Sequence, residues 1–267
     1  MKTQDNDQVR AQVRTAYAKV AKGADGCSVG CCGTQGSGSL AMGYTERDLA
    51  SVPEGSDLGL GCGNPQAIAA LRAGETVLDL GSGAGFDCFL AASRVGGAGR
   101  VIGVDMPPEM VTRARDNARR VSATNVEFRL GEIEHLPIPD DSVDVIISNC
   151  VINLSPDKGA VFREALRVLK PGGRIAISDV IATQAIPKEV SESVEALTGC
   201  VAGAAPRDEL RALLAAAGFE EIKIDPRSES RAIIARCMPG AESFLASAAI
   251  EGKKPGGARC CEPSCCA

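Results

Sequence analysis

A short apolar run followed directly by a glycine-rich turn constrains the fold of this chain more than any other feature. Residues 76–80, Thr-Val-Leu-Asp-Leu, have the composition of a buried strand, and Gly81, Gly83 and Gly85 follow within the next five residues. The segment 87–95 is typical of a helix. A glycine turn between a strand and a helix lets backbone N–H groups approach the anionic part of a ligand. The pattern predicts an α/β fold that binds a nucleotide-like cofactor.

Apolar and amphipathic runs keep alternating beyond this turn, which is typical of βαβ units around a mostly parallel sheet. We predict further strands at 100–104, 126–130, 143–148 and 174–180, and helices at 107–121, 158–169 and 206–217. Two more strand-like runs lie at 220–224 and 230–237. The predicted fold class is therefore α/β, with a Rossmann-like open sheet, helices on both faces and a smaller C-terminal region.

The flanks of this pattern differ from its centre. Residues 8–22 have apolar positions at helical spacing, whereas 23–43 are rich in Gly, Ser and Cys and predict a flexible loop. Residues 251–257 resemble a linker into a disordered tail. We divide the chain into an N-terminal helix and Cys-containing loop (1–64), a cofactor-binding domain (65–182), a C-terminal region that completes the sheet (183–250) and a flexible Cys-rich tail (251–267).

Twelve cysteines accompany a single histidine in the 267 residues. The N-terminus lacks the apolar core of a signal peptide, and no stretch approaches the roughly 18 apolar residues of a membrane helix, so we expect a cytoplasmic protein without membrane contact. In that reducing compartment the cysteines are expected to be thiols. A balance of 29 Lys and Arg against 34 Asp and Glu, with no basic run, disfavours a nucleic-acid partner.

The glycine turn gains meaning from Asp105, which ends the next predicted strand about 20 residues further on, where an acid can accept hydrogen bonds from a ribose. A dinucleotide fingerprint would place its third glycine where Phe86 stands, so an NAD site is the second choice. The run 79–85, with Asp105 and the segment 131–137, resembles the class I S-adenosylmethionine-dependent methyltransferases. That resemblance implies a cofactor site lined by Asp79, Gly81, Gly83, Gly85, Asp105 and Met106, with Ile133 and Glu132 or Glu134 facing the adenine and Asn149 beside the methionine end.

The scarcity of candidate bases in the chain indicates which kind of acceptor takes the methyl group. Methyl transfer to oxygen or nitrogen generally benefits from a base, whereas a lone pair on a proton-free nucleophile needs none. The chain is poor in candidate bases, and we expect its one histidine, His135, to be structural. Trivalent arsenic held by soft thiolates would be such a nucleophile. Cys62 in a glycine-flanked turn, Cys150 after the fourth strand and Cys200 among small residues are the candidate thiols.

A narrower resemblance supports this choice. Residues 43–65 and 148–154 are similar to the corresponding parts of the arsenite methyltransferases, and the similarity extends over most of residues 8–240. It implies that Cys62, Cys150 and Cys200 coordinate As(III), which arrives as a thiol complex, and that thioredoxin or glutathione serves as reductant. An upstream cysteine is implied to assist substrate capture. Cys27, Cys31 and Cys32 compete for that role, and we favour Cys32.

Two other classes of function stay open at this point. One is a methyltransferase acting on a small carbon or oxygen acceptor, and the other is a non-catalytic thiol protein that sequesters or senses metalloids. The tail cysteines Cys260, Cys261, Cys265 and Cys266 could capture arsenite, bind Zn²⁺ or have no function. We assign Cys88 and Cys237 to packing.

Overall fold

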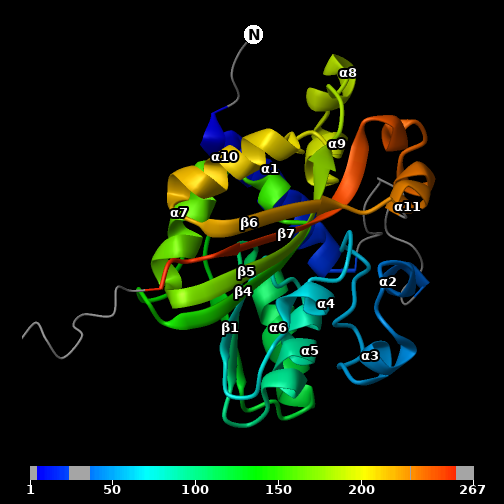
Figure 1. The fold of residues 1–267 in the computed structure, drawn as a ribbon. Coiled ribbons are helices and arrows are strands. Elements are labelled where there is room, and N and C mark those ends of the chain that lie inside the picture. The colour runs from blue at the N-terminus through cyan, green and yellow to red at the C-terminus, as the bar shows by residue number, and fades with distance from the viewer. Residues whose placement is uncertain (1–4, 24–36, 229, 257–267) are drawn as a thin grey trace, which may run out of the picture.

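One sheet runs through the middle of the molecule, and the computed structural model describes residues 5–23, 37–228 and 230–256 (Figure 1). Within those residues seven strands form the sheet in the order β3-β2-β1-β4-β5-β7-β6. The strands are β1 (Thr76–Leu80), β2 (Arg100–Asp105), β3 (Val126–Leu130), β4 (Val143–Asn149), β5 (Leu169–Ala182), β6 (Glu220–Pro226) and β7 (Leu245–Lys253). The first five strands are parallel to one another, whereas β7 pairs antiparallel with both β5 and β6.

Helices cover both faces of this sheet. The α-helices are α1 (Asn6–Ala21), α2 (Ser37–Ala41), α3 (Glu46–Ala50), α4 (Gln66–Ala69), α5 (Phe86–Val95), α6 (Pro108–Arg120), α7 (Lys158–Val168), α8 (Lys188–Ser191), α9 (Val194–Thr198), α10 (Arg207–Ala217) and α11 (Ser230–Cys237), and the short 3-10 turns are η1 (Ile152–Leu154) and η2 (Ala241–Ser243). One apolar core packs α4, α5 and α6 against the sheet, and another packs α7 and α10 against the opposite face (Figure 1). The predicted fold class is confirmed.

The chain reverses its direction across the sheet between β1 and β4. β1 has β2 on one side and β4 on the other, and Leu80 at its end pairs with Ser148 near the end of β4. Ligands of open α/β sheets bind outside the carboxyl ends of the strands at such a switch point. The glycine turn after β1 and the Asn149-Cys150 pair at the end of β4 therefore meet at one edge.

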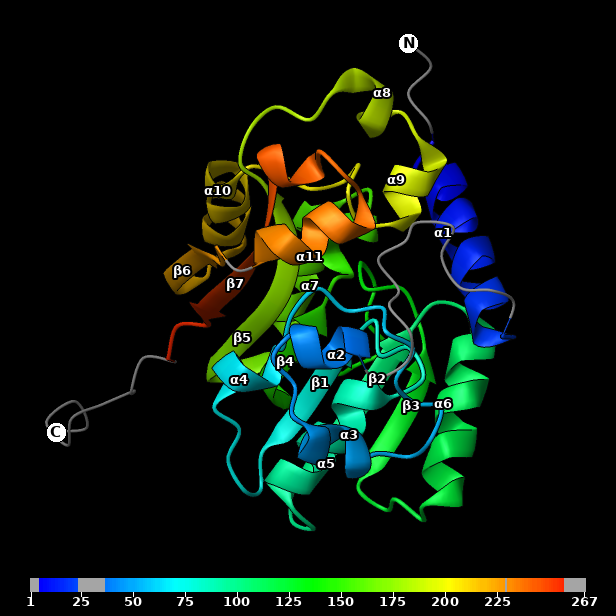
Figure 2. The same cartoon turned by 90° about the vertical axis from the view of Figure 1, so that its right-hand side faces the viewer.

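The N-terminal helix α1 lies across this edge rather than on a face of the sheet. It contacts α6 and α9, as Figure 2 shows. A further apolar cluster joins Val13 of α1 to Cys150, Cys200 and Leu245. The helix thus reaches both the cofactor-binding half and the C-terminal half of the molecule.

Three expectations about local structure were wrong. Residues 230–237 form helix α11 instead of a strand. β7 was missed, and it extends to Lys253 within the predicted linker, because it is paired with β5 along its whole length. Helix α2 lies inside the segment 23–43 that we expected to be a loop. The rest of that segment from residue 24 to 36, and the tail from 257, lie outside the described residues.

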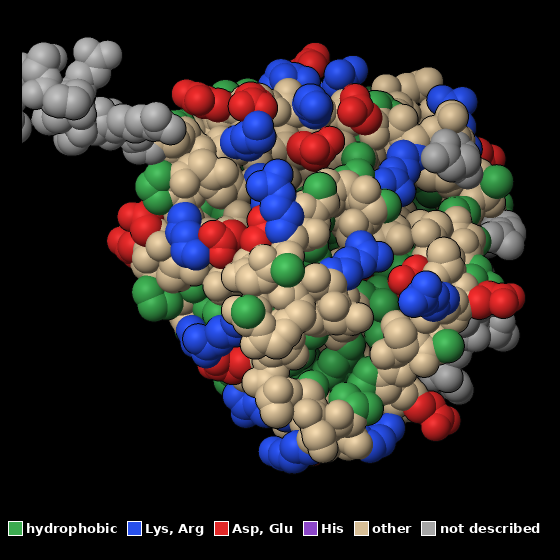
Figure 3. Space-filling model, turned by 60° about the horizontal axis from the view of Figure 1, so that its bottom comes forward, with side chains coloured by type: hydrophobic (Ala, Val, Ile, Leu, Met, Phe, Trp, Pro, Cys, Tyr) green, Lys and Arg blue, Asp and Glu red, His purple; other side chains and the backbone are tan. Residues whose placement is uncertain are grey.

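Charged side chains of both signs are mixed on the face of the molecule shown in Figure 3, and apolar side chains gather in a hollow of that face. No helix among the residues that the structure describes is long and apolar enough to cross a membrane.

Candidate active site

The glycine turn between β1 and α5 uses its three glycines in different ways. All three have positive φ angles, of 71° at Gly81, 53° at Gly83 and 96° at Gly85. A side chain at Gly81 would overlap Val151, and one at Gly85 would come within 2.7 Å of the Phe128 ring. At Gly83 a Cβ would meet no atom within 4 Å, because this glycine faces open space. Gly81 and Gly85 therefore permit close packing, while Gly83 leaves room for a ligand.

Asp105 closes the turn from the neighbouring strand. Its carboxylate accepts a hydrogen bond from the Gly83 N–H at 2.6 Å and another from the Met106 N–H at 2.8 Å. Burial raises the pKa of the Asp105 carboxyl to about 6. The acid at the end of β2 is thereby fixed against the glycine turn.

A cavity opens at this edge of the sheet and is lined by nine of the ten predicted cofactor residues. They are Asp79, Gly81, Gly83, Asp105, Met106, Glu132, Ile133, Glu134 and Asn149. Gly85 is not in the wall, since its place is the N-cap of α5 against Phe128. The glycine turn after β1 and the residues at the ends of β2 and β4, which the sequence pattern singled out, therefore lie at this cavity.

Two buried carboxylates lie at one end of the same cavity. Tyr44 donates its hydroxyl to Asp87 at 2.9 Å, and the Cys88 thiol donates to Asp79 at 3.3 Å. Burial raises the pKa of Asp87 to about 6, and burial together with the charge of Asp87 raises that of Asp79 well above the usual range. Sequence reasoning missed Tyr44 and Asp87, although an acid at a buried position in the first turn of α5 was a usable signal.

Asn149 connects the cavity to the loop that carries Cys62. Its side-chain amide donates to the Tyr44 hydroxyl at 3.0 Å and to the Gly63 carbonyl at 2.8 Å. Its side-chain oxygen accepts from the Cys62 N–H at 3.0 Å. A Cβ at Gly61 would lie 2.6 Å from the same amide nitrogen, so the loop can approach Asn149 only with glycine there.

The three predicted thiols lie together. Cys150 and Cys200 are buried and Cys62 is half-buried. The Cys62 sulfur lies 3.5 Å from the Ser178 carbonyl, which also accepts from the Cys150 N–H at 2.8 Å. The Cys200 thiol donates to the Cys150 carbonyl oxygen at 2.7 Å. Residues far apart in the sequence thus form one sulfur cluster beside the ends of β4 and β5.

The backbone at two of these cysteines is in the left-handed region. Cys150 has φ 58° and Cys200 has φ 62°, conformations that non-glycine residues seldom adopt and that concentrate at functional sites. Burial raises the pKa of the Cys62 thiol. Contacts with the Cys200 and Cys62 thiols, followed by burial, raise the pKa of Cys150 well above the usual thiol value. The raised pKa values keep the Cys62 and Cys150 thiols protonated at neutral pH.

A buried pair, Asp179 and Asn153, lies under the thiols. The Asp179 carboxylate accepts from the Ile152 N–H and from the Asn153 side-chain amide, each at 2.9 Å. The same amide approaches the Cys200 carbonyl oxygen at 3.3 Å. Burial raises the pKa of Asp179 to about 6. Neither residue was predicted, although Asp179 stands out as an acid in the apolar strand β5.

The cysteines line a second cavity that shares a wall with the first. Tyr17, Met42, Gly59–Gly61 and Cys150 border both cavities. The rest of the second cavity is mostly apolar, with side chains from α11 and β7. A ligand bound at the Cys150 sulfur would therefore lie next to a ligand bound in the first cavity.

Helix α1 closes the first cavity through charged contacts. Arg10 donates to Glu134 at 3.2 Å, and Arg14 donates to Glu132 at 3.1 Å. Seven residues further along the helix from Arg10, the Tyr17 hydroxyl donates to the Thr198 carbonyl oxygen at 3.0 Å, just before Cys200. The predicted adenine-side acids thus line the cavity while pairing with arginines of α1.

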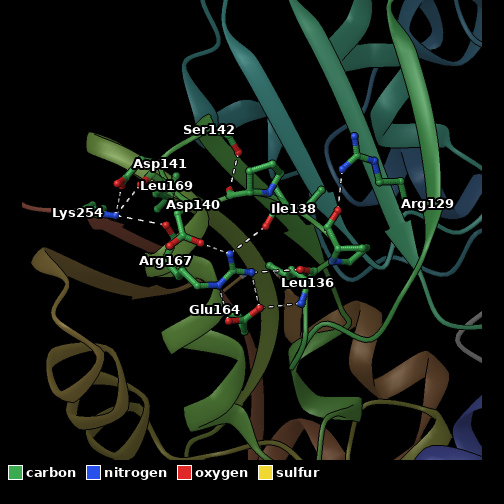
Figure 4. Close-up of polar contacts among 12 residues, drawn as sticks. Arg129, Leu136, Ile138, Asp140, Asp141, Ser142, Glu164, Arg167, Leu169 and Lys254 are labelled. Atoms are coloured by element: carbon green, nitrogen blue, oxygen red, sulfur yellow. Dashed lines mark hydrogen bonds and ion pairs between the residues drawn. The ribbon is translucent and has the colours of Figure 1, made fainter.

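The segment that carries these acids is anchored from behind by α7 (Figure 4). Glu164 accepts from the Leu136 N–H at 2.8 Å, and Arg167 donates to the carbonyl oxygens of Leu136 and Ile138 at 3.2 and 2.9 Å. Arg167 also pairs with Glu164 at 2.7 Å. These contacts fix the position of the loop between β3 and β4.

Among the described side chains, neither Cys88 nor His135 lines either cavity. His135 is exposed, and Cys88 is buried in α5. Cys237 lies in α11, and its side chain is not described. Cys27, Cys31 and Cys32 and the tail cysteines Cys260, Cys261, Cys265 and Cys266 lie outside the described residues.

Residues 71–218 match the family described as "Methyltransferase domain". The fold, the glycine turn and the acid after β2 agree with that class of protein. Among known proteins, an arsenite methyltransferase of Halobacterium salinarum is 52% identical over 94% of this chain and 68% of its own length. Another, of Aquipseudomonas alcaligenes, is 44% identical over 66% of this chain and 51% of its own length.

A solved structure points the same way. The arsenic (III) S-adenosylmethionine methyltransferase from Chlamydomonas reinhardtii is 32% identical, with a TM-score of 0.61, and the match covers 84% of this chain and 76% of that one. The chain belongs to the arsenite methyltransferase family.

Proposed function

We propose that the protein transfers methyl groups from S-adenosylmethionine to trivalent arsenic held by the thiolates of Cys62, Cys150 and Cys200. One observation carries this proposal: the thiol cavity and the cofactor cavity share the wall formed by Cys150 and Gly59–Gly61. An arsenic atom bound at Cys150 can therefore meet a methyl donor across that wall without moving.

The residues of the first cavity fit the cofactor. S-adenosylmethionine supplies an electrophilic methyl group on a positively charged sulfur, and it carries a ribose and an adenine. The carboxylates of Asp79 and Asp87 favour its positive charges, and Asp105 has acceptor capacity for the ribose hydroxyls. The open space at Gly83 admits the ligand close to the backbone.

Arsenic capture needs no external base even though the thiols are protonated. When arsenite exchanges its hydroxide groups for thiolates, each sulfur–arsenic bond that forms sends one thiol proton away with the departing hydroxide as water. If the arsenic arrives as a thiol complex, as we expect, each proton leaves on the departing thiol instead. The raised pKa values of Cys62 and Cys150 are therefore compatible with binding.

Methyl transfer itself moves no proton. The arsenic lone pair forms the arsenic–carbon bond while the sulfur–carbon bond of the donor breaks and its electron pair remains on the donor's sulfur. The three cysteines orient the lone pair, and the two cavities exclude water from the reaction. His135, exposed and outside both cavities, has no part in this step.

Two further roles come from the family resemblance and remain predictions. Thioredoxin or glutathione would keep the three thiols reduced between turnovers. Cys32, or its neighbours Cys27 and Cys31, would assist the entry of arsenic.

The test is to incubate the reduced protein with arsenite, S-adenosylmethionine and glutathione, and to separate arsenic species by chromatography. We expect the wild-type protein to form methylated arsenicals. We expect Cys62→Ser, Cys150→Ser and Cys200→Ser each to lower the rate with inorganic arsenite at least about 100-fold, because the two remaining thiolates are not enough to orient the lone pair. Full activity in any one variant would remove that cysteine from the site.

Cys88→Ser is the matched control. It removes a buried thiol that lines neither cavity and retains a donor for Asp79, so activity should stay within about twofold. If the wild-type protein formed no methylated arsenical, and it and the three site variants methylated a small carbon or oxygen acceptor equally well, the second class of methyltransferase would be correct. Arsenite binding without turnover in the presence of bound cofactor would instead indicate a sequestering protein.

A further inference from the structure

The sulfur cluster contains one ligand atom that arsenic does not need. A carboxylate oxygen of Asp179 and the sulfurs of Cys62 and Cys150 all lie within 4.8 Å of one another. Cys200 is adjacent, since its thiol donates to the Cys150 carbonyl oxygen. Trivalent arsenic takes three sulfurs and keeps a lone pair, so the carboxylate would remain beside it as a fourth, unused donor.

We propose that this cluster is also a binding site for Zn²⁺, with Cys62, Cys150 and Asp179 as three ligands and the fourth position taken by a water molecule or, after a movement of its segment, by the Cys200 thiolate. Zinc takes four ligands of this kind, with Zn–S distances of about 2.3 Å and Zn–O distances of about 2.0 Å. Two thiolates and a carboxylate suit a thiophilic divalent cation. These three donor atoms, which lie within 4.8 Å of one another, need to close by only about an ångström, because a tetrahedron with those bond lengths separates its ligands by about 3.5–3.8 Å.

The surroundings of Asp179 support its role as a ligand. Three N–H groups hold the carboxylate: those of Ile152 and Val180 at 2.9 and 2.7 Å, and the Asn153 amide at 2.9 Å. An ionised carboxylate has about four acceptor positions, so three donors leave one free. Metal-ligating carboxylates are commonly oriented by such hydrogen bonds.

This site would make zinc a competitor of arsenite. Both would use the same sulfurs, but only zinc would use the carboxylate. Zinc binding would release the thiol protons, because thiolate is the ligating form. Zinc binding requires the thiols but neither the cofactor nor turnover, so it can be tested independently of methyl transfer.

The experiment uses the full chain with Cys27, Cys31, Cys32 and the four tail cysteines replaced by serine, so that thiols outside the cluster do not bind the probe. The protein is reduced and kept under anaerobic conditions, and its affinity for Zn²⁺ is measured by competition with a chromophoric chelator. Arsenite binding is measured in parallel. We expect one Zn²⁺ per chain, displaced by arsenite, and no zinc binding in Cys150→Ser.

Asp179→Asn separates the two ligands. We expect it to weaken Zn²⁺ binding by about tenfold or more, because a charged oxygen ligand is lost. Arsenite binding should change less than about threefold, because its three sulfurs remain. The control Asp225→Asn removes an exposed carboxylate on β6 and should alter neither. Equal losses for Zn²⁺ and arsenite in Asp179→Asn would overturn the proposal, since Asp179 would then only support the shape of the site.

X-ray absorption at the zinc edge decides the matter if Asp179→Asn does not fold. A mixed shell of sulfur near 2.3 Å and oxygen near 2.0 Å supports the site, and a shell of sulfur alone or of oxygen and nitrogen alone overturns it. Failure of arsenite methylation with this zinc site intact would refute the proposed function and leave the present inference standing.

Discussion

Gly83 has a function distinct from that of its two neighbours in the turn. Its φ of 53° costs a non-glycine residue about 1–2 kcal/mol, but its Cβ direction is open. Gly83→Ala should therefore destabilise the fold by about 1 kcal/mol while weakening S-adenosylmethionine binding by at least about tenfold, or 1.4 kcal/mol. Urea unfolding and calorimetric titration measure the two effects.

Gly85→Ala should reduce stability more than it reduces cofactor affinity. Its Cβ would meet the Phe128 and Phe89 rings at 2.7 and 2.8 Å. Unfolding free energy should fall by about 2–5 kcal/mol from overpacking and backbone strain together.

Normal binding of the cofactor by Gly83→Ala would contradict the first of these two predictions and show that the glycine turn does not contact the cofactor.

The carboxyls of Asp87 and Asp105 make cofactor affinity depend on pH. Each has a pKa of about 6 in the free protein because of burial. The positive charge of the ligand favours the ionised form of Asp87, and hydrogen bonds from the ribose hydroxyls favour that of Asp105, so both pKa values are lower in the complex. Affinity for S-adenosylmethionine should therefore be greatest above about pH 7 and decline as the pH falls through 6, with protons released on binding near pH 6.

Calorimetry in two buffers of different ionisation enthalpy measures that proton release. S-adenosylhomocysteine lacks the sulfonium charge and should release fewer protons. Proton uptake near pH 6, or an affinity that rises as the pH falls, would show that these carboxyls do not face the ligand.

Helix α1 acts as a cover, and its arginines differ in how deeply their ion pairs with Glu132 and Glu134 are buried. Arg10 is 15% exposed and pairs with Glu134, which is 4% exposed, whereas Arg14 is 47% exposed. Arg10→Ala leaves a buried carboxylate without its cation and should cost about 1.5–3 kcal/mol in unfolding free energy. It should also speed cofactor dissociation, which stopped-flow fluorescence of a cofactor analogue can follow.

Arg14→Ala is the matched control, since a surface ion pair contributes less than about 1 kcal/mol. Equal effects of the two substitutions on dissociation would mean that α1 covers the cavity through its apolar side chains instead.

The elements also show where sequence patterns succeed and fail. The strands from β1 to β5 were predictable because apolar runs alternate with helical ones and the glycine turn fixes the first crossover. Ile233 and Ile234 favoured a strand, yet they lie on helix α11, where packing against the thiol cavity outweighs the β propensity of isoleucine. β7 was concealed by its small residues and by the Gly and Lys at its end, and its pairing with β5 and β6 makes it a strand.

The candidate site was predictable in part for the same reason. Cys62, Cys150 and Cys200 are marked by strand ends and glycine neighbours that can be read locally. Asp179 stands out as an acid in an apolar strand, but the groups that Asp179 and Asn153 bind are distant in the sequence, so no local pattern shows their role.

At the scale of the whole molecule, Tyr17 links the two cavities. It lines both, and its hydroxyl holds the Thr198 carbonyl oxygen two residues before Cys200. Filling the cofactor cavity should fix α1 and thereby the Cys200 segment. We expect S-adenosylhomocysteine to tighten arsenite binding about fivefold, a typical coupling between sites, and Tyr17→Phe to reduce that factor below about twofold.

Arsenite titrations with and without S-adenosylhomocysteine measure this coupling. A wild-type factor of one would show that the sites bind independently, and an unchanged factor in Tyr17→Phe would assign the coupling to another contact.

The hydrogen bond from the Cys200 thiol to the Cys150 carbonyl has a consequence for survival in a stressed cell. Peroxides and alkylating agents attack thiolates, not thiols. The thiols of Cys62 and Cys150 keep their protons because their pKa values are raised, and so they offer such reagents little to react with. Arsenite, whose own hydroxides carry the protons away, is not hindered in this way, and the protein can wait for its toxic substrate without being damaged by the oxidants that accompany it.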